Sequence, residues 1–180
     1  MVQIKITLKG SKPPIWRRLE LRADTQLEEL HAIIQTVFEW KNSHLHSFEN
    51  SRRDSFVSPH DPFSQDWSDS YEGMTIADMF GFSGKKFTYH YDFGDSWYHE
   101  IALEKELPPD PKTAYPRCTA GRRAAPLDDM GGLWGFYDYL EAVKNPKHEM
   151  HEDAIEWLGE DFDAAAFDLG AIDGRLGVFR

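Results

Sequence analysis

Residues 87–103 have the sequence FTYHYDFGDSWYHEIAL. Aromatic and aliphatic residues alternate with polar ones on both sides of Gly94 and Asp95. Period-two patterns rich in aromatic residues are typical of β-strands. Glycine tolerates the positive φ that a tight turn requires, so Gly94 and Asp95 predict a two-residue hairpin turn. The stretch therefore predicts two antiparallel strands joined by these two residues.

This turn length fixes which side chains face one another. It places His90 opposite His99, and Asp92 opposite Trp97, with Cβ atoms about 4.5–5.5 Å apart. We expect these four residues and Ile101 to share one face of the hairpin. A shift of one residue in the pairing would disperse the group, because successive side chains point to opposite faces.

The first half of the chain predicts strands around one helix. Alternation at residues 2–8 and 15–22 predicts two strands joined by a Gly-Pro turn. Apolar residues at three- to four-residue spacing from Leu27 to Phe38 predict a helix with one buried face. Thr25 and Glu28 predict a capping box at the start of this helix. Residues 43–50 predict a third strand. The order strand, strand, helix, strand resembles a β-grasp arrangement.

The second half is less regular before it becomes helical. Residues 51–73 predict a long polar loop that Trp67 and Tyr71 would attach to the protein body, and residues 75–80 predict a short helical turn. Proline-rich residues 107–132 predict an irregular segment. Three helices are predicted next, at residues 133–144, 147–158 and 168–176. We expect an α+β fold, with a mostly antiparallel sheet closed by C-terminal helices. The chain would be a single domain, 1–180, with the sheet and its inserted helix in 1–107 and the irregular loop and C-terminal helices in 108–180.

Composition narrows the functional classes. The formal net charge is −11, which disfavours nucleic acid as a partner because phosphate binding needs basic side chains. Cys118 is the only cysteine, so an internal disulfide and a thiolate zinc cluster are both excluded. The N-terminus lacks the apolar stretch of a signal peptide, and no run approaches the length of a membrane span. We expect a cytoplasmic protein without a membrane partner.

Ordered motifs along the chain resemble the plasmid pRiA4b ORF-3-like family over nearly its whole length. They are PPIWRR at 13–18, HLHSF at 44–48, YDFGDSWYH at 91–99, YPRC at 115–118, DDMGG at 128–132 and EWLG at 156–159. The resemblance implies no established activity, although some members are labelled transposon resolvases. This chain departs from the family pattern at Leu127-Asp128, where relatives tend to have Pro-Glu, and at Ala125, where many have a second cysteine.

The resolvase label is not supported by the residues present. A serine recombinase needs an activated serine, an arginine cluster for the scissile phosphate and a basic DNA-reading module. The only arginine doublets are Arg17-Arg18, Arg52-Arg53 and Arg122-Arg123, and no helix-turn-helix pattern ends the chain. Solvated loop and strand positions explain these doublets more simply.

A metal site is a second hypothesis. Its candidate ligands are His44, His46, His90, Asp92 and His99. Two histidines with one carboxylate suit iron, zinc or manganese. The simpler interpretation makes His99 a core residue and has Asp92 bond the turn amides or the Trp97 indole. We predict no cofactor and leave a divalent metal open.

Three functional hypotheses remain from the sequence. The first is a non-enzymatic binding module, with a protein as one candidate partner. Its candidate binding surface comprises Arg17, His44, His46, Asp92, Asp95, Trp97, His99 and Arg122, and includes the loop from residue 118 to residue 132. The alternative is a metal-dependent or acid–base enzyme that uses Asp92, Asp95 and His99. Mobile-element DNA processing is the third, and the net charge disfavours it.

Overall fold

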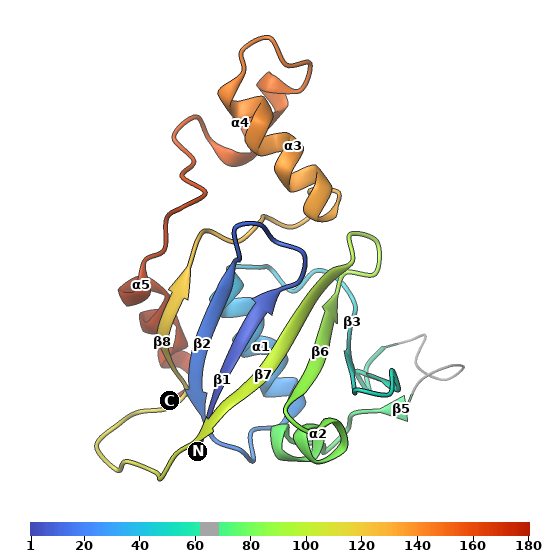
Figure 1. Ribbon diagram of the computed structural model, residues 1–180, viewed down its shortest axis with the longest axis vertical. Coiled ribbons are helices and arrows are strands. Elements are labelled where there is room, and N and C mark those ends of the chain that lie inside the picture. Colours follow the sequence, from blue (N-terminus) through green and yellow to red (C-terminus); the bar gives the residue numbers. More distant parts are fainter. Residues whose placement is uncertain (62–68) are drawn as a thin grey trace.

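One eight-stranded sheet organises the computed structural model, which describes residues 1–61 and 69–180 (Figure 1). The strand order is β5-β4-β3-β6-β7-β1-β2-β8. Neighbouring strands are antiparallel except for β4 and β5. The strands are β1 (Val2–Leu8), β2 (Trp16–Leu21), β3 (His46–Glu49), β4 (Ser55–Val57), β5 (Asp69–Ser70), β6 (Lys86–Tyr91), β7 (Trp97–Glu106) and β8 (Arg117–Arg122). The expected α+β fold with a mostly antiparallel sheet is confirmed.

Helices cover one face of the sheet and extend beyond one of its ends. They are α1 (Leu27–Phe38), α2 (Ile76–Ser83), α3 (Gly132–Lys144), α4 (His151–Leu158), α5 (Leu169–Arg175) and the 3₁₀ helix η1 (Leu176–Phe179). Figure 1 shows α1 behind the central strands, with α3 and α4 beyond the end of the sheet where the β1–β2 turn lies. The backbone N–H of Lys12 in that turn donates to the Tyr137 hydroxyl at 2.6 Å. None of the described helices has the length and apolar character needed to cross a membrane.

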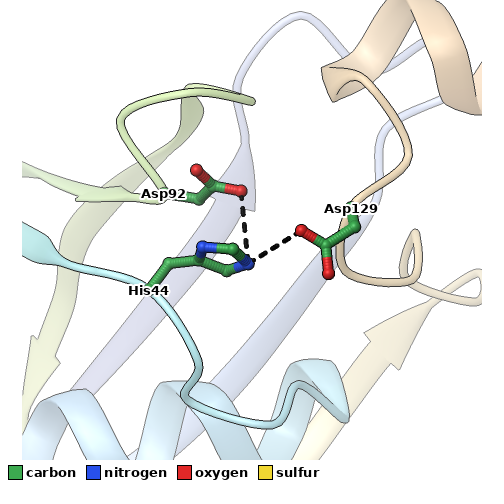
Figure 2. A group of neighbouring side chains, drawn as sticks. All are labelled: His44, Asp92 and Asp129. Atoms are coloured by element: carbon green, nitrogen blue, oxygen red, sulfur yellow. Dashed lines mark ion pairs between the residues drawn. The ribbon is translucent and has the colours of Figure 1, made fainter.

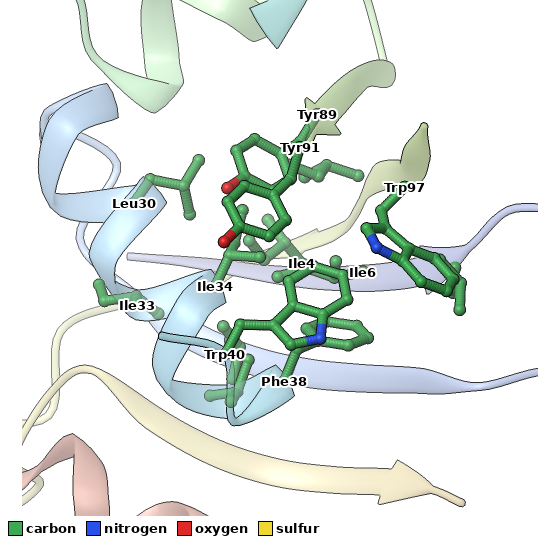
Figure 3. Close-up of a cluster of buried hydrophobic side chains, with 14 of the residues drawn as sticks. Ile4, Ile6, Leu30, Ile33, Ile34, Phe38, Trp40, Tyr89, Tyr91 and Trp97 are labelled. Carbon is green, nitrogen blue, oxygen red and sulfur yellow. The ribbon is translucent and has the colours of Figure 1, made fainter. Parts of the chain in front are cut away.

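The core forms because the apolar faces of β1 and α1 meet. Alternate residues of β1 point inward and are buried, as the period-two pattern requires. The face of α1 that packs on them repeats at three- to four-residue spacing. Figure 3 shows Ile4 and Ile6 beside Ile34, Phe38 and other buried side chains. The predicted order of strand, strand, helix and strand is confirmed; β3 pairs with β4 and β6, not with the first hairpin.

The hairpin register differs from the prediction by one residue. Tyr91 pairs with Trp97, and Tyr89 pairs with His99, so residues 92–96 form the loop and not Gly94 and Asp95 alone. The expected opposition of His90 to His99, and of Asp92 to Trp97, is therefore wrong. The physical reason is burial: the observed register places the inward residues of β6 opposite those of β7 on the core side, including Ile101 opposite Phe87.

The loop itself is built from Asp92. Its φ is 56°, in the left-handed region, and its Oδ1 accepts the N–H groups of Gly94 and Asp95 at 3.0 and 3.3 Å. Aspartate commonly closes turns through such side-chain bonds. Ser96 also has a left-handed φ of 57°, and its N–H donates to the Asp92 carbonyl at 2.6 Å. The positive-φ positions in this loop are thus Asp92 and Ser96.

Several predicted boundaries also change. β8 lies within the segment expected to be irregular, and β4 and β5 lie within the predicted polar loop. Thr25 does not cap α1, which follows Gln26; the Thr25 carbonyl instead accepts the Ile76 N–H at 3.0 Å. A capping box occurs at Thr75 and Asp78, at the start of α2. Tyr71 is buried, whereas Trp67 lies outside the described residues.

Candidate functional site

Three connecting segments meet beside the tip of the β6–β7 hairpin, and we call this place the three-loop junction. They are residues 40–45 between α1 and β3, residues 92–96 of the hairpin, and residues 123–131 before α3. The Asp92 N–H donates to the Leu45 carbonyl at 2.9 Å, and the Lys41 N–H donates to Asp128 Oδ2 at 3.0 Å. Hydrogen bonds therefore connect segments that are far apart in the sequence.

Two further contacts fix the third segment in place. The Trp40 indole Nε1–H donates to the Pro126 carbonyl at 2.8 Å, and Gly131 N–H donates to Asp95 Oδ2 at 2.9 Å. Gly132 approaches the hairpin so closely that an added Cβ would lie 2.5 Å from the Asp95 carbonyl oxygen. The hairpin loop is thus docked directly on the start of α3.

His44, Asp92 and Asp129 form a compact group at this junction (Figure 2). His44 Nε2 lies 3.0 Å from Asp129 Oδ1 and 3.7 Å from Asp92 Oδ2. One donor atom from each residue lies within 4.8 Å of the other two. Each side chain comes from a different loop, so the group exists only in the folded chain. One imidazole nitrogen and two carboxylate oxygens are donors typical of a divalent-cation site.

An acidic pocket adjoins the group. It has a volume of about 430 Å³ and includes Asp128 and Asp129 of the junction with Glu39 at the end of α1 and Glu156 of α4. The indole of Trp157 forms another wall and is 47% exposed. Glu39 is already paired with Arg175, so the carboxylates of Asp128, Asp129 and Glu156 are those that, with the accessible aromatic ring, suit a positively charged ligand.

The structure brings some of the predicted site residues together and places the others elsewhere. His44, Asp92 and Asp95 meet at the junction, together with the end of the predicted 118–132 loop. Four others are buried away from the surface: Arg17, His46, Trp97 and His99. Arg122 is exposed at the end of β8, and His90 stacks on Tyr98, at 3.9 Å between ring centroids, on the side opposite the core.

Asp129 is the functional candidate that sequence reasoning missed. It lies in the DDMGG motif, but the sequence predicts no metal-ligand role for it. Nothing in the sequence places residue 129 beside residues 44 and 92. The connection between β8 and α3 brings it there.

Arg17, a predicted member of the binding surface, lies inside the protein. It has no exposed surface, and burial lowers its guanidinium pKa to about 10. Its Nε–H donates to the Val37 carbonyl in the last turn of α1 at 2.9 Å, and its Nη1 donates to the Trp16 and Arg122 carbonyls at 2.9 and 3.2 Å. The guanidinium also packs between the rings of Phe38 and Phe167. Arg17 thus joins the C-terminal end of α1, whose dipole favours a cation, to β2 and β8.

The buried histidines are not assembled into the predicted metal site. His46 stacks on His31 with ring centroids 3.5 Å apart, and His46 Nε2 lies 2.8 Å from the Tyr71 hydroxyl. His99 is enclosed by core aromatic rings, and its Nδ1 lies 3.2 Å from the Trp97 carbonyl. Of the five predicted ligands, only His44 and Asp92 belong to the observed group.

Burial of these histidines predicts an acid-sensitive fold. Desolvation lowers the pKa of His31 and His90 to about 4, and that of His46 and His99 to about 3, from 6.5. Below pH 6.5 the unfolded chain gains protons that the folded chain does not. The stabilisation by the neutral histidines is therefore fully present above about pH 6.5, and the free energy of unfolding falls as the pH drops towards 3–4. His31, His46 and His99 each contribute roughly 2 kcal/mol of loss between pH 7 and pH 5.

Urea unfolding at pH 7, 6 and 5 measures this effect as a falling transition midpoint. Replacing His99 with phenylalanine should make the pH dependence shallower. Replacing the exposed His60 with glutamine should leave the pH dependence unchanged. A midpoint that stays constant from pH 7 to pH 5 would contradict the prediction.

The fold and site define an α+β protein in which loops at one end of a mostly antiparallel sheet carry an acidic pocket beside a group of one histidine and two aspartates. The chain belongs to the family described as plasmid pRiA4b ORF-3-like protein, whose model matches residues 1–171. The resemblance inferred from the motifs is therefore confirmed.

Two known proteins are similar to the chain over most of its length. It is 32% identical over 174 residues to the uncharacterized protein y4hQ of Sinorhizobium fredii (strain NBRC 101917 / NGR234), covering 96% of this chain and 89% of that protein. It also resembles the crystal structure of MM3350, a protein of unknown function from Methanosarcina mazei Go1. That similarity has a TM-score of 0.83 and 38% identity, and covers 94% of this chain and 95% of the other. Neither description assigns an activity.

Proposed function

We propose that this protein is a non-enzymatic binding module that takes a basic side chain of a partner protein into the acidic pocket beside the three-loop junction. The observation that carries the proposal is the composition of this pocket. Glu39, Asp128, Asp129 and Glu156 line it with the Trp157 indole, and Lys41 is the one basic residue among its lining residues.

The chemistry of such a pocket favours lysine or arginine. A guanidinium or ammonium group gains energy from nearby carboxylates and from the face of an indole, most of all where water is partly displaced. A net charge of −11 adds long-range attraction for a basic partner and speeds its association. The same charges disfavour nucleic acid.

The enzyme hypothesis based on Asp92, Asp95 and His99 has less support. His99 has no exposed surface, and Asp92 Oδ1 and Asp95 Oδ2 accept backbone N–H groups of the hairpin loop and of Gly131. These are the contacts expected of residues that maintain a turn. We therefore assign these two carboxylates a role in holding the pocket walls together.

A matched pair of peptides tests the proposal. A short peptide with a central arginine should bind saturably at about 50 mM salt and more weakly as salt screens the charges. The corresponding peptide with citrulline, which has nearly the same shape without the charge, should bind at least about five-fold more weakly. Isothermal titration calorimetry in the presence of a chelator measures both affinities.

Matched variants locate the binding site. Glu156→Gln and Trp157→Ala should each weaken binding of the arginine peptide about five-fold or more. Trp134→Ala is the control, because Trp134 is 85% exposed on α3 and does not line the pocket. Equal affinity for the two peptides, or unchanged affinity in both pocket variants, would overturn the proposal.

A further inference from the structure

We propose that His44, Asp92 and Asp129 bind one divalent transition-metal ion, with one donor atom from each side chain. This inference goes beyond the proposed binding of a basic ligand and does not depend on it. The ion would connect the three loops of the junction, since each donor is carried by a different loop.

The distances between donor atoms fit a shared ion. Metal–ligand bonds of about 2.0–2.2 Å to nitrogen and oxygen place neighbouring donors roughly 2.9 Å apart in octahedral geometry and roughly 3.4 Å apart in tetrahedral geometry. His44 Nε2 lies 3.0 Å from Asp129 Oδ1 and 3.7 Å from Asp92 Oδ2. Figure 2 shows the imidazole edge directed at the space between both carboxylates.

The central nitrogen has no hydrogen-bond partner. His44 Nε2 is buried, and its 3.0 Å approach to Asp129 does not have hydrogen-bond geometry. Buried polar atoms in folded proteins almost always have a partner, so an unpaired nitrogen facing two carboxylates needs an explanation. A cation between the three groups supplies one, because it accepts the nitrogen lone pair and neutralises both carboxylates.

The surrounding structure also holds the donor atoms of Asp92 and His44 in position. The Asp92 side chain is only 10% exposed, and the N–H groups of Gly94 and Asp95 hold its Oδ1, which leaves Oδ2 directed at His44. The His44 ring contacts Tyr91 edge-on, with centroids 5.8 Å apart. Hydrogen bonds and packing that hold the ligands in place typically raise metal affinity.

The donor set indicates the kind of ion. An imidazole nitrogen favours zinc, manganese or iron over magnesium and calcium, which prefer oxygen ligands alone. Three protein donors leave at least one coordination position open to water or to another ligand. Asp129 also lines the acidic pocket, so the ion would lie beside that pocket.

Calorimetric titration of chelator-treated, full-length protein with zinc chloride and with manganese chloride tests the inference. We expect one ion per chain, and binding of magnesium or calcium at least about ten-fold weaker. Asp129→Asn should reduce the affinity at least about ten-fold without harming the fold. The Asp129 side chain is 59% exposed, and asparagine tolerates its left-handed φ of 60°.

His44→Gln should have the same effect on metal affinity, whereas His60→Gln controls for surface histidines that bind metal weakly. The inference would be overturned if neither zinc nor manganese bound with one ion per chain. It would also be overturned if Asp129→Asn bound the metal with undiminished affinity. Peptide binding is measured with a chelator present, so failure of the metal site and failure of the basic-ligand pocket give different results.

Discussion

Replacing Arg17 with alanine is expected to lower the free energy of unfolding by about 3–5 kcal/mol, the range typical of broken buried charge contacts and large core truncations. The change removes donors from the carbonyls of Trp16, Val37 and Arg122 and leaves a cavity between two phenylalanine rings. Because these carbonyls come from β2, the end of α1 and β8, the loss should loosen the contact between the helix and this edge of the sheet. Urea unfolding at pH 7.5 measures it.

Two matched variants separate the causes. Arg18 neighbours Arg17 but points to the other face, where it pairs with Glu104 on the surface, so Arg18→Ala should cost only about 0–1 kcal/mol. Arg17→Met keeps most of the volume and avoids burying a charge, so it should be less destabilising than Arg17→Ala. If Arg17→Ala were no more destabilising than Arg18→Ala, the assigned role of Arg17 would be wrong.

Replacing Gly132 with alanine is expected to cost about 3 kcal/mol and to displace the hairpin loop from α3. Its φ is +71°, and the new Cβ would lie 2.5 Å from the Asp95 carbonyl oxygen. A left-handed conformation costs a non-glycine residue about 1–2 kcal/mol, and the overlap with backbone adds to that cost because neither segment moves freely. Thermal or urea unfolding measures the stability loss.

Gly131→Ala provides the control for backbone strain alone. Gly131 has nearly the same φ, +74°, but its Cβ would come no nearer than 4.0 Å to another atom. Its replacement should therefore cost only about 1–2 kcal/mol. Amide chemical shifts of residues 92–96 should change in Gly132→Ala much more than in Gly131→Ala. Equal stability losses in the two variants would show that the predicted close contact does not limit the fold.

Local patterns predicted the strands and helices in which apolar residues repeat with a single regular spacing. Alternation identified β1, three- to four-residue spacing identified the buried face of α1, and the helix predicted at residues 133–144 is α3. The family also followed from short motifs that lie along the whole chain. These properties depend on side chains close together in the sequence, so the sequence displays them directly.

Partnerships between distant segments could not be predicted in the same way. The glycine in the hairpin loop suggested a two-residue turn, but matching Trp97 and Ile101 with the inward side of β6 outweighed it and shifted the register. β8 was missed because its strand conformation is completed by pairing with β2, across about 100 residues. Burial and long-range pairing overrode the local turn pattern in both cases.

The sequence by itself determined the family, the α+β class and the apolar faces of β1 and α1, because period and composition encode which side of each element avoids water. Tertiary structure alone decided that Arg17 is buried and that Asp129 joins His44 and Asp92. The three members of this group come from separate loops, whose approach depends on sheet pairing and on the docking of Gly132 against Asp95. No local pattern contains that information, because packing of the core supplies the free energy that brings the loops together.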